Sequence, residues 1–221
     1  MEQIQGRVPP DIPPYVFGGW LFDATPESQL QLQELCVGII AQLHQIKQKS
    51  PDTDFLEFHT KGDTALKRHF TNQKEYYYWV VQDSRQHPVI EQAFDWLESH
   101  WPEESESVLS WGDARIGNIM FDSKTLEPVA VLDWEMAGLA PVEVDLGWMI
   151  FMHKFFQLIA EALEFPGMPK FMTSRDVTSK FTDLTGIVPK NIDWFEIYAA
   201  TRHAIITVSY THLTLPTTMW V

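Results

Sequence analysis

One stretch of eight residues carries most of the information in this sequence: Trp111-Gly112-Asp113-Ala114-Arg115-Ile116-Gly117-Asn118. Short apolar, β-rich runs flank it and predict strands at 108–111 and 118–121. Turn-forming residues and a third run at 129–132 follow, so we expect the last two strands to pair as a hairpin. The polar side chains therefore lie at strand ends and turns, where a rigid scaffold presents groups to a ligand.

The spacing of the polar residues in this stretch indicates phosphoryl transfer. In a protein kinase, an Asp of the catalytic loop accepts the proton of the substrate hydroxyl, and an Asn five positions later binds a metal ion. Asp113 and Asn118 have this spacing, and Asp133 follows the third strand run, where it is placed to complete the metal site. Oxygen ligands in this number suit Mg²⁺, which leaves its remaining positions to water and phosphate oxygens.

These residues resemble the catalytic signature of aminoglycoside phosphotransferases and choline kinases, roughly His-Gly-Asp-x-x-x-x-Asn, then Ile-Asp-Trp-Glu, then Asp-Leu. The second and third elements are present here as Leu132-Asp133-Trp134-Glu135 and Asp145-Leu146. The resemblance extends to Gly6-Arg7, Gly19-Trp20-Leu21 and Leu43-His44. It is strongest to the kinase domains attached to some acyl-CoA dehydrogenases.

The resemblance implies an α+β fold that is mainly helical: the C-terminal lobe of a protein-kinase-like fold, with a short catalytic β-hairpin. It implies that Asp113 is the catalytic base and that Asn118 and Asp133 bind Mg²⁺. Asp145 would support the loop. The cofactors would be ATP and Mg²⁺, and the partner would be a small molecule with a hydroxyl group.

Three further residues of the motif are candidates for the site. Arg115 is a candidate for catalysis, and Glu135 is a candidate for support of the site. Trp111 stands where the family has His, and an indole cannot accept a hydrogen bond as an imidazole does. In the family that His looks mainly structural, so the tryptophan bears on the bracing of the loop more than on the chemistry. We assign Trp111 a supporting role.

This sequence lacks the motifs with which a kinase binds the phosphates of ATP. It has no glycine-rich phosphate loop and no lysine on a predicted strand. In the family these belong to a lobe that comes first, so we expect the proline-rich residues 1–19 to be a connector from that lobe, without regular structure. Met1, Glu2 and Gln3 would lie at the hinge, whose backbone meets the adenine. The chain alone is expected to bind ATP feebly and to be inactive.

Helical spacing of apolar residues predicts the rest of the fold, a helical catalytic lobe over 20–208. The expected helices cover about 26–49, 63–82, a stretch from 88, 144–163, 175–184 and 194–207. Large apolar residues on the fourth of these, including Trp148, are expected in the core. The threonine-rich tail, 209–221, resembles a translated sequencing adaptor and should be a detached, non-native segment that does not continue the last helix; a genuine apolar tail is the alternative.

Composition excludes several classes of partner. Thirty acidic and sixteen basic residues give a net charge of −14, which repels nucleic acid and anionic membrane surfaces. The sequence has one cysteine and no apolar run long enough for a membrane span, so we expect a cytoplasmic protein.

The sequence therefore predicts an enzyme that moves the γ-phosphoryl group of ATP to a small-molecule hydroxyl. A non-catalytic kinase-like binding or scaffold module is the main alternative, and a magnesium-dependent hydrolase is a third. The substrate cannot be read from the motif, because the resemblance covers a superfamily that acts on aminoglycosides, choline-like amines, macrolides and hydroxyacyl thioesters. The resemblance to the dehydrogenase-linked group favours hydroxylated acyl compounds as the substrate.

Overall fold

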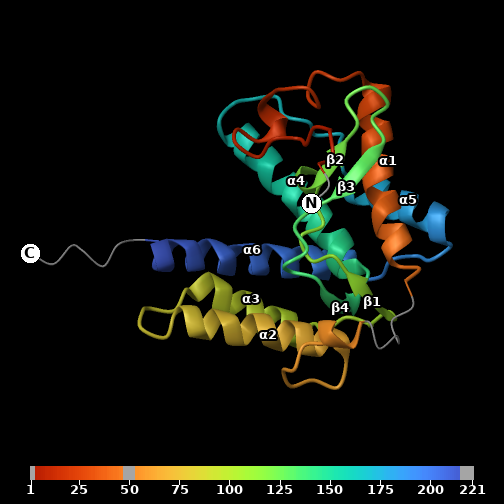
Figure 1. Cartoon of the computed structure of the whole chain (residues 1–221). Coiled ribbons are helices and arrows are strands. Elements are labelled where there is room, and N and C mark those ends of the chain that lie inside the picture. Colours follow the sequence, from red (N-terminus) through yellow and green to blue (C-terminus); the bar gives the residue numbers. More distant parts are fainter. Residues whose placement is uncertain (1–2, 47–52, 215–221) are drawn as a thin grey trace, which may run out of the picture.

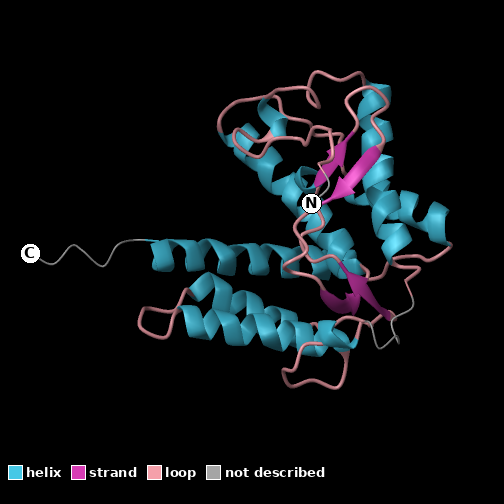
Figure 2. Cartoon of the chain, in the orientation of Figure 1, coloured by secondary structure: helices cyan, strands magenta, loops and turns pink. Residues whose placement is uncertain are grey.

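A computed structural model describes residues 3–46 and 53–214, and helices dominate it (Figure 2). The helices are α1 (Pro26–Leu43), α2 (Ala65–Val80), α3 (Pro88–Ser99), α4 (Glu143–Ala162), α5 (Ser174–Thr185) and α6 (Ile192–Thr214). The strands are β1 (Ser107–Ser110), β2 (Ile119–Phe121), β3 (Pro128–Val131) and β4 (Gly138–Pro141). The predicted fold class, mainly helical with a short hairpin, is confirmed.

The strands form two small antiparallel pairs. In the predicted hairpin, β2 pairs with β3, with Ile119 opposite Val131. The other pair joins β1 to β4, which the sequence did not predict. All four residues of Gly138–Pro141 are buried, so they show no alternation of apolar and polar residues, and a glycine and a proline bound the strand.

The buried apolar residues that the structure describes form two hydrophobic clusters, built on the helices and strands labelled in Figure 1. One gathers α1, α4, α5 and the hairpin, and the other gathers α2, α3 and α6. Helix α4 packs against α1, α5 and α6, so it connects the two clusters. The loop between β1 and β2 is therefore held by elements from both halves.

Helix α1 begins where the sequence predicts and ends early. The Thr25 hydroxyl accepts a hydrogen bond from the Ser28 amide at 3.2 Å, and Pro26 occupies the first helical position. The expected end near residue 49 is wrong, because the helix stops at Leu43. The amides of Gln45 and Ile46 donate to carbonyls three residues back, which tightens the last turn and closes the helix.

The connector at 1–19 has more structure than expected. A 3-10 helix covers Tyr15–Phe17, and Arg7 forms an isolated bridge with Phe121 of β2. Tyr15 is buried, and its hydroxyl lies 2.9 Å from Nδ1 of His153 on α4. Burial lowers the pKa of His153 to about 4. The prediction of a segment without regular structure is wrong, because its apolar side chains pack into the core.

The prediction that the last helix ends before residue 209 is also wrong. Helix α6 runs to Thr214, and Ser209 is buried, with its hydroxyl 2.6 Å from that of Tyr76. Threonine lowers helix propensity only slightly, so an established helix can propagate through such a run. Residues 215–221 lie outside the described part, and the non-native origin of the tail stays a prediction. No described helix has the length and apolar character needed to cross a bilayer.

Candidate active site

The loop from β1 to β2 is fixed by one carboxylate. Asp145, in the first turn of α4, is 1% exposed. Its Oδ1 accepts hydrogen bonds from the Ser110 hydroxyl and the Gly112 amide, both at 2.9 Å, and its Oδ2 accepts one from the Trp111 amide at 2.8 Å. Burial raises the pKa of Asp145, and these hydrogen bonds and the charge of Arg202 act against that rise.

Gly112 meets a steric requirement at the same point. Its φ is +90°, and a Cβ there would lie 2.1 Å from the carbonyl oxygen of Met136. Only glycine fits, because both the backbone conformation and the close approach exclude a side chain. The loop before Asp113 can therefore lie directly against the segment that follows Asp133.

The next residue, Asp113, is held by donors from three side chains. Its Oδ1 accepts from Nε1 of Trp148 at 2.7 Å, and its Oδ2 accepts from Nδ2 of Asn118 at 2.7 Å. Nε of Arg115 donates to Oδ2 at 3.0 Å, while Nη1 of Arg115 pairs with Asp11 of the connector. Burial opposes the charge of Arg115, but the two carboxylates raise its pKa overall. The structure thus brings together Asp113, Asn118 and Arg115.

The hairpin register places the two expected metal ligands at one end. Ile119 lies opposite Val131, so Asn118 and Asp133 flank the same end of the β2–β3 pair, and the Leu132 amide donates to the Asn118 carbonyl at 2.9 Å. Asp133 is exposed and has a φ of +56°.

The donor set at this end fits Mg²⁺. Because Nδ2 of Asn118 is bonded to Asp113, the amide oxygen is the atom left for a ligand. No cluster of three or more His, Cys, Asp or Glu side chains suited to a metal occurs among the described residues. One carboxylate and one amide oxygen nevertheless suit Mg²⁺, which commonly keeps water and phosphate oxygens as its other ligands.

Trp111 supports this end of the β2–β3 hairpin by donating hydrogen bonds to the backbone. Its Nε1 lies 2.8 Å from the Leu132 carbonyl oxygen and 3.1 Å from that of Asp133. An indole cannot accept a hydrogen bond as an imidazole does, but its N–H contacts the backbone carbonyls of Leu132 and Asp133.

The remaining predicted residues lie farther out. Glu135 is exposed and borders a cavity of about 160 Å³, together with Met136 and Arg202. Met1 and Glu2 lie outside the described residues. Gln3 is exposed and precedes Arg7, which forms the isolated bridge with Phe121 of β2.

Sequence reasoning missed three residues that contact this site. Trp148 was predicted as core, and it is buried, but its indole also holds Asp113. Asp11 and Arg202 carry no sequence signal, because they lie 102 and 89 positions away from Asp113 along the chain. Only tertiary packing brings them to the loop.

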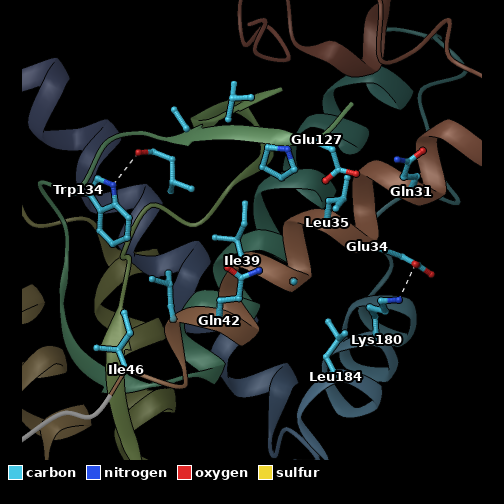
Figure 3. A pocket seen from close by; sticks show the side chains of 16 residues that line it. Gln31, Glu34, Leu35, Ile39, Gln42, Ile46, Glu127, Trp134, Lys180 and Leu184 are labelled. Atoms are coloured by element: carbon cyan, nitrogen blue, oxygen red, sulfur yellow. Dashed lines mark hydrogen bonds and ion pairs between the residues drawn. The ribbon is translucent and has the colours of Figure 1, made fainter. Parts of the chain in front are cut away.

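A groove of about 860 Å³ lies between α1, β3 and α5 (Figure 3). Its rim carries the Glu34–Lys180 ion pair, 2.7 Å, and Trp134, whose Nε1 donates to the Val131 carbonyl at 3.0 Å. Of the Asp133-Trp134-Glu135 element only Trp134 contributes to its described lining. Asp113, Asn118 and Asp133 are not among the described residues that line this groove.

Comparison with known proteins assigns the family. A family described as "Phosphotransferase enzyme family" matches residues 12–165, which include all of the site from Asp113 to Asp145. The chain belongs to this family. Among curated proteins, it is 30% identical over 148 residues to acyl-CoA dehydrogenase family member 11 of Pongo abelii, and 26% identical over 110 residues to family member 10 of Mus musculus. These alignments cover 66% and 50% of the chain but only 17% and 10% of the relatives.

Solved phosphotransferases share the fold of the family member described here. A Ralstonia eutropha protein assigned to the aminoglycoside phosphotransferases superposes with a TM-score of 0.73 at 21% identity, over 99% of this chain and 64% of that one. An aminoglycoside-3'-phosphotransferase of type VIII gives a TM-score of 0.61 at 15% identity, over 91% and 67%. At these identities the likeness establishes the kinase-like fold.

Proposed function

We propose that the protein carrying this chain transfers the γ-phosphoryl group of ATP to a hydroxyl of a small molecule, with Asp113 as the base. The observation that carries the proposal is the convergence of Asp113, Asn118 and Asp133 at one end of the β2–β3 hairpin. Family membership supports the reaction class. The identity of the phosphoryl donor rests on the kinase-like spacing of these residues.

Asp113 is suited to accept the proton of the incoming hydroxyl. As that oxygen forms its bond to the γ-phosphorus, the bond from phosphorus to the β-phosphate oxygen breaks, ADP leaves and the proton goes to Asp113. Donors from Trp148, Asn118 and Arg115 fix the carboxylate, so it need not reorganise during transfer. Arg115 acts by orienting Asp113.

Asn118 and Asp133 would hold Mg²⁺ through an amide oxygen and a carboxylate. The ion would supply charge neutralisation on the β- and γ-phosphates. Trp111 keeps the Asp133 backbone in place, and Asp145 keeps the loop before Asp113 in place. Met1, Glu2 and Gln3 would lie at the hinge beside the adenine, and Glu135 would support the site from the segment after Asp133.

The partner would be a small hydroxylated molecule, in a protein that we expect to be cytoplasmic. Related solved structures belong to aminoglycoside phosphotransferases, and curated relatives are acyl-CoA dehydrogenase family members. These names support small-molecule acceptors as a class, with aminosugars and hydroxylated acyl compounds as the two candidates.

The proposal is tested by incubating the complete protein with magnesium and γ-labelled ATP and a panel of aminoglycosides, choline-like amines and hydroxyacyl compounds. We expect magnesium-dependent transfer of label to at least one class, with ADP released in equal amount. Label that appears only as free phosphate would favour a hydrolase instead. No turnover and no nucleotide binding would favour the scaffold module.

A further inference from the structure

Arg202 of α6 is a cation enclosed beside the loop that carries Asp113. Its side chain is 1% exposed. Nη2 donates to the Gly112 carbonyl oxygen at 3.1 Å, and Nε and Nη1 are buried with no hydrogen-bond partner among the described residues. Burying a charge without full hydrogen bonding is costly, so stability alone does not account for a guanidinium here.

The guanidinium also contacts the indole that holds Asp113. Its central carbon lies 4.5 Å from the centroid of the Trp148 ring, which is cation–π distance. The same indole donates to Oδ1 of Asp113 at 2.7 Å. Arg202 therefore contacts both the backbone of the residue before Asp113 and the side chain that fixes one of its oxygens.

The other donors to Asp113 come from its own loop. Arg115 and Asn118 lie two and five residues along the chain and move with the loop. Trp148 and Arg202 come from α4 and α6, which pack against each other and link the two hydrophobic clusters. Among the described residues, Trp148 is the donor to the Asp113 carboxylate that comes from a helix, and Arg202 packs on its ring. Catalytic geometry requires such support from rigid elements.

We propose that Trp148 and Arg202 are positioning residues for Asp113: Trp148 fixes its Oδ1, and Arg202 holds both the Trp148 ring and the Gly112 carbonyl. The catalytic meaning of this pair rests on the proposed function, in which Asp113 is the base. The claim that these two residues hold Asp113 in place does not depend on that function, and it can be tested on the chain itself.

The test uses the indole N–H signal of Trp148 in the ¹⁵N-labelled chain, assigned as the signal lost in Trp148→Phe. Its hydrogen bond to a carboxylate should shift it downfield and slow its exchange with solvent, and Asp113→Ala, which removes both acceptor oxygens, should abolish both effects. In Arg202→Met we expect the signal to move toward its Asp113→Ala position and its exchange to accelerate about 10-fold or more, by local opening. Arg175→Met, an exposed position on α5, is the matched control and should change neither.

An unchanged Trp148 signal with unchanged exchange in a folded Arg202→Met would overturn the proposal. If far-UV circular dichroism shows that this variant does not fold, Arg202→Lys takes its place. Lysine keeps the charge and loses the planar guanidinium, so the signal should move in the same direction by a smaller amount. A wild-type signal in Arg202→Lys would equally overturn the proposal.

Turnover by the complete protein separates this inference from the proposed function. Arg202→Met and Trp148→Phe should each lower kcat about 10-fold or more with the KM for ATP unchanged, because they disturb only the proton acceptor. Unchanged kcat in both variants would remove their catalytic role. If Asp113→Asn itself keeps full turnover, the proposed function fails, while the indole signal still decides whether these two residues hold Asp113 in place.

Discussion

Replacing Asp145 with asparagine should destabilise the protein by about 2–4 kcal/mol. The carboxylate accepts three hydrogen bonds in a buried setting, two at Oδ1 and one at Oδ2. Asparagine has the same shape but only one oxygen, so its NH₂ group must face either the Trp111 amide or the Gly112 amide. One buried N–H then loses its partner, at about 1–3 kcal/mol, and each bond that remains loses roughly 1 kcal/mol with the charge.

These contributions sum to about 3–5 kcal/mol, and relief of the cost of burying the charge offsets part of them, which brings the expected loss to about 2–4 kcal/mol. The assay is urea unfolding followed by circular dichroism and tryptophan fluorescence, with Asp183→Asn, an exposed position on α5, as the control. We expect the control to stay within about 0.5 kcal/mol of the wild type. A folded Asp145→Asn that is equally close to the wild type would refute the claim that this carboxylate holds the loop.

Three other predictions concern pH, metal binding and the end of α6. Burial lowers the pKa of His153 to about 4, so as the pH falls the unfolded chain takes up a proton at this residue before the folded chain does. The free energy of unfolding should therefore be highest above about pH 6.5 and drop by about 2 kcal/mol at pH 5. Urea unfolding across pH measures this drop, which should be smaller in His153→Gln. Asp133→Ala should raise the magnesium concentration for half-maximal turnover about 10-fold or more, whereas an unchanged requirement would remove Asp133 from the metal site. Ser209→Ala should lower the free energy of unfolding by about 1 kcal/mol, because it removes the hydrogen bond to Tyr76. No measurable change would favour the expectation that the detached tail begins at residue 209.

The parts of the fold that depend on local pattern were predictable. The spacing of Asp113 and Asn118 and the turn before β3 are readable because each depends on residues close together in the sequence. Strand β4 was not predictable, because its residues are all buried and its partner β1 lies 28 or more positions away. The extent of α6 was missed for a similar reason: packing of Ser209 against Tyr76 outweighs the composition of the tail.

The residues of the site also differ in whether local pattern or tertiary packing reveals them. Asp113, Asn118, Asp133 and Asp145 could be named because each stands in a short motif, although their roles stay predictions. Trp148 could be assigned only to the core, since helical spacing shows that a face is buried and does not show which polar atom its indole meets.

The central claim, that Asp113 is the base of a phosphotransferase, is tested most directly by the rate of phosphoryl transfer in Asp113→Asn. The complete protein would be assayed with magnesium ATP and its best acceptor from the panel, beside Asp183→Asn as the control. Asparagine keeps the shape and removes the proton acceptor, so we predict that kcat falls about 100-fold or more in a variant that circular dichroism shows to be folded. A folded Asp113→Asn with near-normal kcat would contradict the account.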